Sequence, residues 1–167
     1  MNLNELYEIS DCKLNNVMLF NGNCLEIMKN IPDNSINCII CDLPYGTTAL
    51  SWDKIINFNE LWKQYNRIIK ENSNIILFSS GEFTYKLYES NKEQYKYKLI
   101  WKKNVPTGMN SVKYRPMKYY EEILVFSNGN KTTYNPQMKK RVGEKKLVIN
   151  MNIIMEIIHT FQIHLKK

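Results

Sequence analysis

The segment Ile36-Asn37-Cys38-Ile39-Ile40-Cys41-Asp42-Leu43-Pro44-Tyr45-Gly46 determines the fold that the sequence predicts. Its first six residues are nearly all apolar, which is typical of a central parallel strand buried on both faces. The strand ends at an acid, and α/β sheets bind ligands at the carboxyl ends of their strands. We therefore expect Asp42 to project into a cleft, Pro44 to stiffen the turn and Tyr45 to offer a ring face to a planar guest. The alternative is an ordinary strand-to-loop turn, in which Asp42 is a cap and Tyr45 packs.

The rest of the chain alternates short apolar runs with amphipathic stretches, which predicts an α/β fold. Strands are predicted at residues 17–20, 36–41, 74–79, 95–101 and 122–127, with a hairpin partner for the last at 131–134. Helices are predicted at residues 24–29, at 58–69 after an Asn57 cap, and at 82–90 with Phe83, Leu87 and Tyr88 as the buried side. Residues 102–119 are predicted to form a long loop, and an apolar residue at every fourth position predicts a terminal helix at 149–165.

The composition fits one compact domain with an excess of positive charge. The chain has 167 residues, of which 44% are hydrophobic, a formal net charge of +7 and a pI near 9.1. Lysine and arginine displace counterions from phosphates, so this excess favours polyanionic partners. The sequence shows neither a secretory signal nor an uninterrupted apolar span, and we therefore expect a cytoplasmic protein without a membrane segment.

The four cysteines lie in the first quarter of the chain, at positions 12, 24, 38 and 41. Cys38 and Cys41 spell C-x-x-C, but residues three apart in a strand point to opposite faces of the sheet. We therefore predict cysteines that pack in the interior, and no metal site.

The segment Asp42-Leu43-Pro44-Tyr45 resembles the D-P-P-Y motif of amino-group DNA methyltransferases, in the D-L-P-Y form found among phage and restriction-associated adenine-N6 enzymes. Other segments look like their family counterparts and follow in the same order. They are Asn21 to Leu25, Thr47-Thr48, Trp52-Asp53, Phe78 to Phe83, Trp101 to Asn104, Arg115-Pro116, Glu121 to Phe126 and Tyr134 to Met138. The resemblance therefore covers roughly residues 15–138.

This resemblance implies the target-base half of a Rossmann-like methyltransferase sheet. The implied reaction moves a methyl group from S-adenosylmethionine to an exocyclic amino group in double-stranded DNA, inside a bacterial or phage-infected cell. That nitrogen is a poor nucleophile because its lone pair is conjugated into the ring. The Asp42 carboxylate and the Leu43 carbonyl would accept its two N–H groups, and the carboxylate would stabilise the positive charge that develops. Tyr45 would stack on the base after the base has been flipped out of the duplex.

The identity of the target base follows less directly. The D-L-P-Y form favours adenine N6, and cytosine N4 is the alternative, because both present an exocyclic amino group to the same two acceptors. Methylation at cytosine C5 is disfavoured, since it needs a cysteine nucleophile that usually follows a proline, and the sequence has no Pro-Cys pair. An RNA substrate stays open.

Two further sets of residues are expected to contact the cofactor and the DNA. Asn23, Cys24 and Asp42 are expected to contact S-adenosylmethionine. For the basic residues, clustering in the predicted loop favours phosphate contact over a solvated basic face, and for Trp52 a loop anchor is the alternative. The expected DNA contacts are Trp52, Lys102, Lys103, Lys113, Arg115 and Lys118. Glu121 and Glu122 are expected to orient the loop or to pair with a lysine rather than to catalyse.

The sequence departs from the family pattern in three places. Asn23 stands where the family usually has Asp, and Tyr120 stands where it often has His. The six glycines include no pair two apart, so no G-x-G cradle for the cofactor can be written. We therefore expect a chain truncated or frameshifted after about Met138, with residues 1–138 as the catalytic, target-base half and residues 139–167 as a divergent basic and amphipathic tail. The alternatives are a non-catalytic DNA-binding remnant and one half of a split methyltransferase that a second polypeptide completes.

Overall fold

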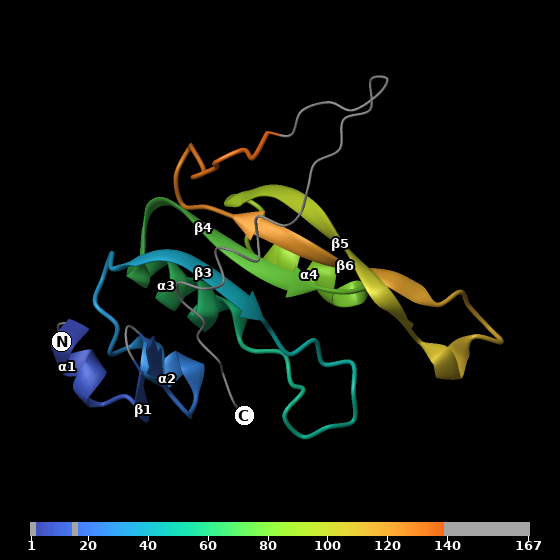
Figure 1. Cartoon of the computed structure of the whole chain (residues 1–167), viewed down its shortest axis with the longest axis horizontal. Helices are drawn as coiled ribbons and strands as arrows, with labels where there is room; N and C mark the ends of the chain where they lie inside the picture. The colour runs from blue at the N-terminus through green and yellow to red at the C-terminus, as the bar shows by residue number, and fades with distance from the viewer. Residues whose placement is uncertain (1–2, 15–16, 139–167) are drawn as a thin grey trace.

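A computed structural model of the chain, which describes residues 3–14 and 17–138, contains a four-stranded mixed sheet (Figure 1). The strands lie in the order β3 (Ile36–Asp42), β4 (Ile69–Ser79), β6 (Lys118–Phe126) and β5 (Tyr95–Thr107). β3 and β4 are parallel, whereas β6 runs antiparallel to both of its neighbours. The predicted α/β class is confirmed.

Strand β3 lies at one edge of the described sheet. Within residues 3–14 and 17–138 its one hydrogen-bonded neighbour is β4, and Ile39, 5% exposed, is its one fully buried residue. The prediction of a central strand buried on both faces is therefore wrong for this part of the chain. An apolar run indicates that a strand packs against something, but it does not say how many strands lie beside it.

Two helices cover one face of the sheet (Figure 1). They are α3 (Phe58–Ile68) and α4 (Glu82–Ser90), as predicted. The Asn57 side-chain oxygen caps α3 by accepting hydrogen bonds from the backbone N–H groups of Asn59 (3.0 Å) and Glu60 (3.4 Å). The buried faces of the helices meet the sheet residues Ile75, Leu77, Leu124 and Phe126 in one core.

The other face of the sheet carries a smaller apolar cluster around Ile76, Ile123 and Val125. Cys38 packs against this cluster, whereas Cys41 packs against the core under the helices, so the predicted opposite orientation of the two thiols is confirmed. Burial raises the pKa of both thiols to about 11, which keeps them protonated and inert at neutral pH.

The N-terminal part of the chain packs against the core that lies under the helices. It contains α1 (Leu3–Glu8), an antiparallel pair of β1 (Cys12–Leu14) and β2 (Val17–Leu19), and the short α2 (Cys24–Met28). α1 and β1 had no counterpart in the prediction, because each is too short to show a period.

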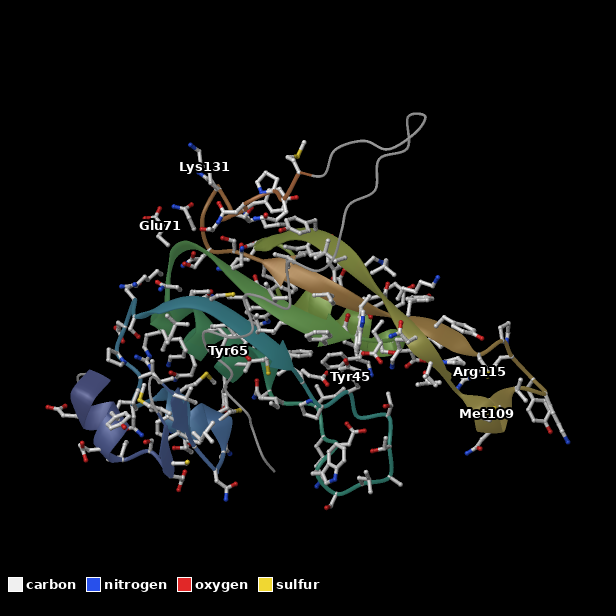
Figure 2. The ribbon with its side chains drawn as sticks, in the orientation of Figure 1. Tyr45, Tyr65, Glu71, Met109, Arg115 and Lys131 are labelled. Atoms are coloured by element: carbon white, nitrogen blue, oxygen red, sulfur yellow. The ribbon has the colours of Figure 1, made fainter. Side chains whose placement is uncertain are left out.

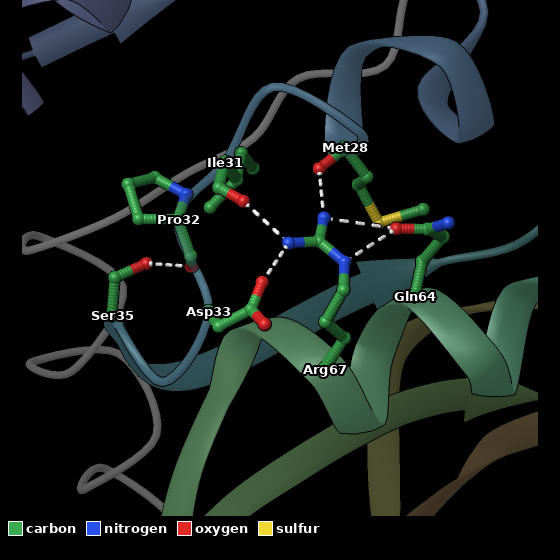
Figure 3. A network of polar contacts seen from close by, with 7 residues as sticks. All are labelled: Met28, Ile31, Pro32, Asp33, Ser35, Gln64 and Arg67. Atoms are coloured by element: carbon green, nitrogen blue, oxygen red, sulfur yellow. Dashed lines mark hydrogen bonds and ion pairs between the residues drawn. The ribbon is translucent and has the colours of Figure 1, made fainter. Parts of the chain in front are cut away.

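Arg67 of α3 connects this N-terminal part to the helix through hydrogen bonds of its side chain (Figure 3). Its guanidinium donates hydrogen bonds to the carbonyls of Met28 (2.6 Å) and Ile31 (2.7 Å), and it forms an ion pair with Asp33. The same group donates two hydrogen bonds to the Gln64 side chain, at 2.9 Å and 3.1 Å. One planar cation thus satisfies two carbonyls that end α2 and its following turn.

An Arg67→Ala variant is expected to lower the free energy of unfolding by about 2–3 kcal/mol, because two carbonyls lose charged hydrogen-bond donors. Chemical denaturation measures this change. Arg67→Lys should recover only part of it, since an ammonium cannot reproduce the planar fork. Equal stabilities for the wild type and the alanine variant would contradict this account of the contact.

Strands β5 and β6 are longer than the strands predicted at residues 95–101 and 122–127. Residues 102–119 do not form one long loop: β5 continues to Thr107, β6 begins at Lys118, and these two residues pair. Pro106 is tolerated because β5 is an edge strand of the described sheet, where a missing N–H need not interrupt a ladder. Pairing across the hairpin thus overrides the weak local pattern.

Two smaller predictions are also wrong. Residues 131–134 form no strand; instead the backbone N–H of Thr133 donates a hydrogen bond to the carbonyl of Asn72 in β4 (3.2 Å). Tyr88 is 37% exposed rather than buried, and its ring edge packs against Tyr95 with centroids 5.0 Å apart. The predicted helix at 149–165 lies outside the described residues.

Candidate active site at the carboxyl end of β3

Asp42 is the last residue of β3 and pairs with Phe78 of β4. It is exposed, and the Tyr45 hydroxyl donates a hydrogen bond of 2.8 Å to its Oδ1. Each oxygen of a carboxylate can accept hydrogen bonds, so Asp42 can accept a further donor while Tyr45 holds it. The local chain therefore presents an oriented carboxylate at the strand end.

Leu43 anchors the turn that follows. Its side chain is 3% exposed and belongs to the core, while Pro44 after it is half-buried and has a fixed φ. The backbone between Asp42 and Tyr45 is thus held by one buried side chain and one rigid ring.

Tyr45 lies between the strand end and α4 (Figure 2). Its ring stacks on Phe83, with centroids 4.9 Å apart and planes 25° apart, and Phe58 packs on Phe83 at 6.0 Å. Burial, and next the hydrogen bond to Asp42, raise the pKa of Tyr45, so its hydroxyl remains a donor. One face of the ring is therefore braced by the core.

Asp53 organises the loop after Tyr45, a role that the sequence did not reveal. Its carboxylate is 7% exposed and accepts hydrogen bonds from the backbone N–H groups of Gly46 (2.8 Å), Thr47 (2.8 Å) and Thr48 (2.6 Å). Gly46 has a φ of +67°, and a Cβ there would lie 3.0 Å from the Ile55 side chain, so glycine is required. The available signal was the Trp52-Asp53 pair, which gave no role to the carboxylate.

The charge of Asp53 makes this loop pH-sensitive. A hydrogen bond from the Thr48 side chain, together with the backbone donors, lowers the pKa of Asp53 to about 2, although its burial opposes this. The unfolded value is about 3.9, so the stabilisation is fully present above about pH 4 and is lost as the pH falls through about 2.

Asp53→Asn is accordingly expected to be less stable than the wild type near neutral pH, with a difference that shrinks as the pH approaches about 2. Denaturation at a series of pH values measures the difference, and Glu71→Gln, which removes an exposed carboxylate, is the matched control. A difference that stayed constant with pH would argue against this role of the Asp53 charge.

Two of the three residues expected to contact the cofactor, Asn23 and Cys24, lie at the start of α2, and the third, Asp42, ends β3. Asn23 is exposed, and its side-chain oxygen caps the helix by accepting a hydrogen bond of 2.9 Å from the Leu25 backbone N–H. Asn and Asp cap helices equally well, so this departure from the family pattern preserves the local structure. Cys24 is half-buried and packs against the core under the helices, as does Cys41, the neighbour of Asp42. The start of α2 and the end of β3 thus border the same core.

The basic residues expected to contact DNA fall into two groups. Lys103 forms an ion pair with Glu121, both side chains being about 20% exposed, and the Lys118 Nζ lies 2.5 Å from the Ser80 hydroxyl. Lys102, Lys113 and Arg115 are exposed on the β5–β6 hairpin. Trp52 is 42% exposed and lies in the loop that Asp53 organises.

The two glutamates of β6 both pair with lysines, as predicted. Glu121 pairs with Lys103, and Glu122 pairs with Lys98 at 2.6 Å while also accepting a hydrogen bond of 2.8 Å from the Thr84 hydroxyl. Burial opposes ionisation of Glu122, but these hydrogen bonds prevail and lower its pKa. The glutamates thus join the two strands of the hairpin, and Glu122 also joins β6 to α4.

No protein-family model matches the chain. The chain is 26% identical over 176 residues to the type II methyltransferase M2.MboI of Moraxella bovis, an alignment that covers 87% of this chain. It spans 62% of the length of that relative.

Solved structures of DNA methyltransferases share the fold. The PvuII DNA methyltransferase, described as cytosine-N4-specific, matches with a TM-score of 0.57 and 10% identity, over 93% of this chain and 67% of that one. The M1.HpyAVI complex with SAM matches with a TM-score of 0.55 and 19% identity, over 90% of this chain and 78% of that one. The predicted fold class and the predicted relationship to DNA methyltransferases are confirmed.

In the part of the chain that the structure describes, no helix combines the length and the apolar character that a membrane span requires. Nor do residues 3–14 and 17–138 contain a group of three or more side chains suited to hold a metal ion.

Proposed function

We propose, from its relationship to DNA methyltransferases, that this chain carries the target-base half of an amino-group DNA methyltransferase, with adenine N6 as the preferred acceptor. The observation that supports this most is the exposed Asp42 carboxylate at the carboxyl end of β3, oriented by the Tyr45 hydroxyl at 2.8 Å. Ligands of α/β sheets bind at this end of the strands.

The proposed chemistry uses two acceptors against one amino group. The Asp42 carboxylate accepts one N–H and the Leu43 carbonyl the other, which draws the nitrogen towards tetrahedral geometry and frees its lone pair. The carboxylate then stabilises the positive charge that develops on nitrogen. The buried Leu43 side chain and the hydrogen bond from Tyr45 fix these two acceptors before the base arrives.

Tyr45 is proposed to stack on the flipped base. Phe83 supports one face of its ring, so the opposite face is the one on which a planar base would lie. A ring fixed on a buried partner loses little conformational freedom when the base binds.

The described residues fit S-adenosylmethionine in part. Asp42, Asn23 and Cys24 would hold it, and the start of α2 and the end of β3 border the same core, which is compatible with one ligand touching both. When bound, this cofactor supplies an electrophilic methyl group. The sequence contains no G-x-G pair, so we propose that this chain alone binds the cofactor weakly and that further residues, on a second polypeptide in the split-enzyme version, complete the site.

The choice between adenine N6 and cytosine N4 rests on the motif. The D-L-P-Y form favours adenine, whereas the PvuII enzyme, which shares the fold, is described as cytosine-N4-specific. Both bases fit the same two acceptors, so the product has to be identified chemically.

A non-catalytic DNA-binding remnant is the second candidate, and the lack of a glycine-rich cradle favours it. Equilibrium dialysis with labelled S-adenosylmethionine separates the two, since micromolar binding excludes the remnant.

Methyl transfer from that cofactor to mixed-sequence duplex DNA is then measured for this chain alone and with the part of M2.MboI that the alignment leaves uncovered, produced separately. Mass spectrometry of the digested DNA should show N6-methyladenine. N4-methylcytosine would correct the base, and no methylated base in either mixture would favour the remnant.

A further inference from the structure

The β5–β6 hairpin ends in a projecting turn, residues 108–117, which we call the hairpin tip. Figure 1 shows it extending beyond the rest of the sheet, and Figure 2 places Met109 and Arg115 on it. Three apolar or aromatic side chains of the tip are exposed to an unusual extent: Met109 by 71%, Val112 by 52% and Tyr114 by 90%. Side chains of this size rarely lie so open together unless they meet a partner.

The charge around the tip has a single sign. From residue 94 to residue 120 the sequence contains no Asp or Glu, and its charged residues are Lys96, Lys98, Lys102, Lys103, Lys113, Arg115 and Lys118. Lys98 and Lys103 are neutralised by Glu122 and Glu121, whereas no ion pair of the described residues involves Lys113 or Arg115. The tip therefore presents an aromatic ring between two exposed cations.

The backbone holds this arrangement in a defined turn. The Ser111 carbonyl accepts hydrogen bonds from the backbone N–H groups of both Tyr114 (2.9 Å) and Arg115 (3.0 Å). Gly108 enters the turn with a φ of +95°, and its carbonyl accepts the Ser111 N–H at 3.0 Å. Because the turn is already formed, docking it costs little backbone entropy.

We propose that the hairpin tip is a DNA-inserting arm, in which Tyr114 enters the base stack of duplex DNA while Lys113 and Arg115 hold the flanking phosphates. This inference rests on the proposed function, in which the substrate is duplex DNA. A two-stranded ribbon fits a groove of the duplex, and apolar wedges flanked by cations are a known means of opening a base step. Insertion is easiest where stacking is already interrupted, as it is beside a flipped base.

Charge decides between DNA and a protein partner. A protein surface would have to be strongly acidic to match a segment without one carboxylate over 27 positions, whereas every DNA duplex offers phosphates at regular spacing. An aromatic ring can stack on any of the four bases. Tyr114 would therefore help to open the duplex rather than recognise a particular DNA sequence.

The experiment measures binding of the full chain to two duplexes of identical sequence, one intact and one with a single abasic site. Tyr114→Ala is expected to weaken binding to the abasic duplex by about 5- to 150-fold, the range that stacking of one base contributes, and to weaken binding to the intact duplex less. Tyr114→Phe should bind like the wild type. Tyr85→Ala, which removes a tyrosine that is 74% exposed on α4, is the matched control.

Lys113→Gln and Arg115→Gln should instead weaken binding to both duplexes alike, and each should reduce the slope of log affinity against log salt by about 1. Fluorescence anisotropy at several salt concentrations measures both quantities. These positions lie outside the core, so circular dichroism should show folded variants.

The proposal is overturned if Tyr114→Ala binds each duplex with the same affinity as the control Tyr85→Ala. It is also overturned if the variants of the hairpin tip alter self-association or RNA binding and leave the affinity for duplex DNA unchanged. Its failure is separable from failure of the proposed function. The binding assay needs no cofactor, whereas the function fails when the Asp42 carboxylate proves dispensable for methyl transfer.

Discussion

A Phe83→Ala variant is expected to unfold with a free energy about 3–5 kcal/mol lower than the wild type. Phe83 is 2% exposed and is the shared partner of Tyr45 and Phe58, with ring centroids 4.9 Å and 6.0 Å away. Loss of the Phe83 ring leaves a cavity beside the Tyr45 ring. The Tyr45 side chain, which donates the hydrogen bond to Asp42, then loses its stacking partner. The same change should therefore disturb the core and the candidate site together.

Urea denaturation followed by the fluorescence of the buried Trp62 measures this loss. Tyr85→Ala on the same helix is the matched control, because that side chain is 74% exposed and its truncation should change stability by less than about 0.5 kcal/mol. Phe83→Leu should fall between the two, since it keeps most of the buried volume. Similar stabilities for Phe83→Ala and Tyr85→Ala would show that Phe83 does not support Tyr45.

Local signals in the sequence predicted the elements that form the candidate site. The apolar run before Asp42 gave β3, and the cap and periodicity of residues 57–68 gave α3 with its buried face. The amphipathic stretch at residues 82–90 correctly predicted both ends of α4. These features depend on neighbouring residues in the chain, which is why periodicity and capping suffice to find them.

Contacts between residues that lie far apart in the chain could not be predicted from such local signals. The length of the β5–β6 hairpin is set by pairing of Thr107 with Lys118, eleven positions apart, and no local pattern favours strand there. The edge position of β3 depends on which strands reach it. Tertiary partners decide both features, and a single sequence does not contain the partner information.

The same limit applies to the charged residues of the site. Lys103 and Arg115 look alike in the sequence, yet Lys103 is paired with Glu121 while Arg115 lies exposed on the hairpin tip. The sequence assigned no role to the Asp53 carboxylate, and only the fold shows that it accepts hydrogen bonds from three backbone N–H groups. Residue type and spacing thus predicted a candidate site, and three-dimensional packing shows which of its charged groups are paired or hydrogen-bonded and which are exposed.

The central claim is that the Asp42 carboxylate is the charged acceptor for the amino group of the target base. Replacing it by asparagine keeps the shape and one acceptor oxygen, but it removes the charge that stabilises the transition state. By analogy with the removal of one group from an oxyanion hole, methyl transfer should fall by about 10²- to 10³-fold. DNA affinity should change little, because the base remains able to stack on Tyr45.

Single-turnover transfer of labelled methyl groups to duplex DNA, in the mixture with the uncovered part of M2.MboI, tests this claim most directly. Wild type, Asp42→Asn and Glu89→Gln are compared, the last being an exposed carboxylate-to-amide control on α4. The account predicts a loss of at least about 100-fold for Asp42→Asn and an unchanged rate for Glu89→Gln. An Asp42→Asn variant that transfers methyl groups at the wild-type rate would contradict it.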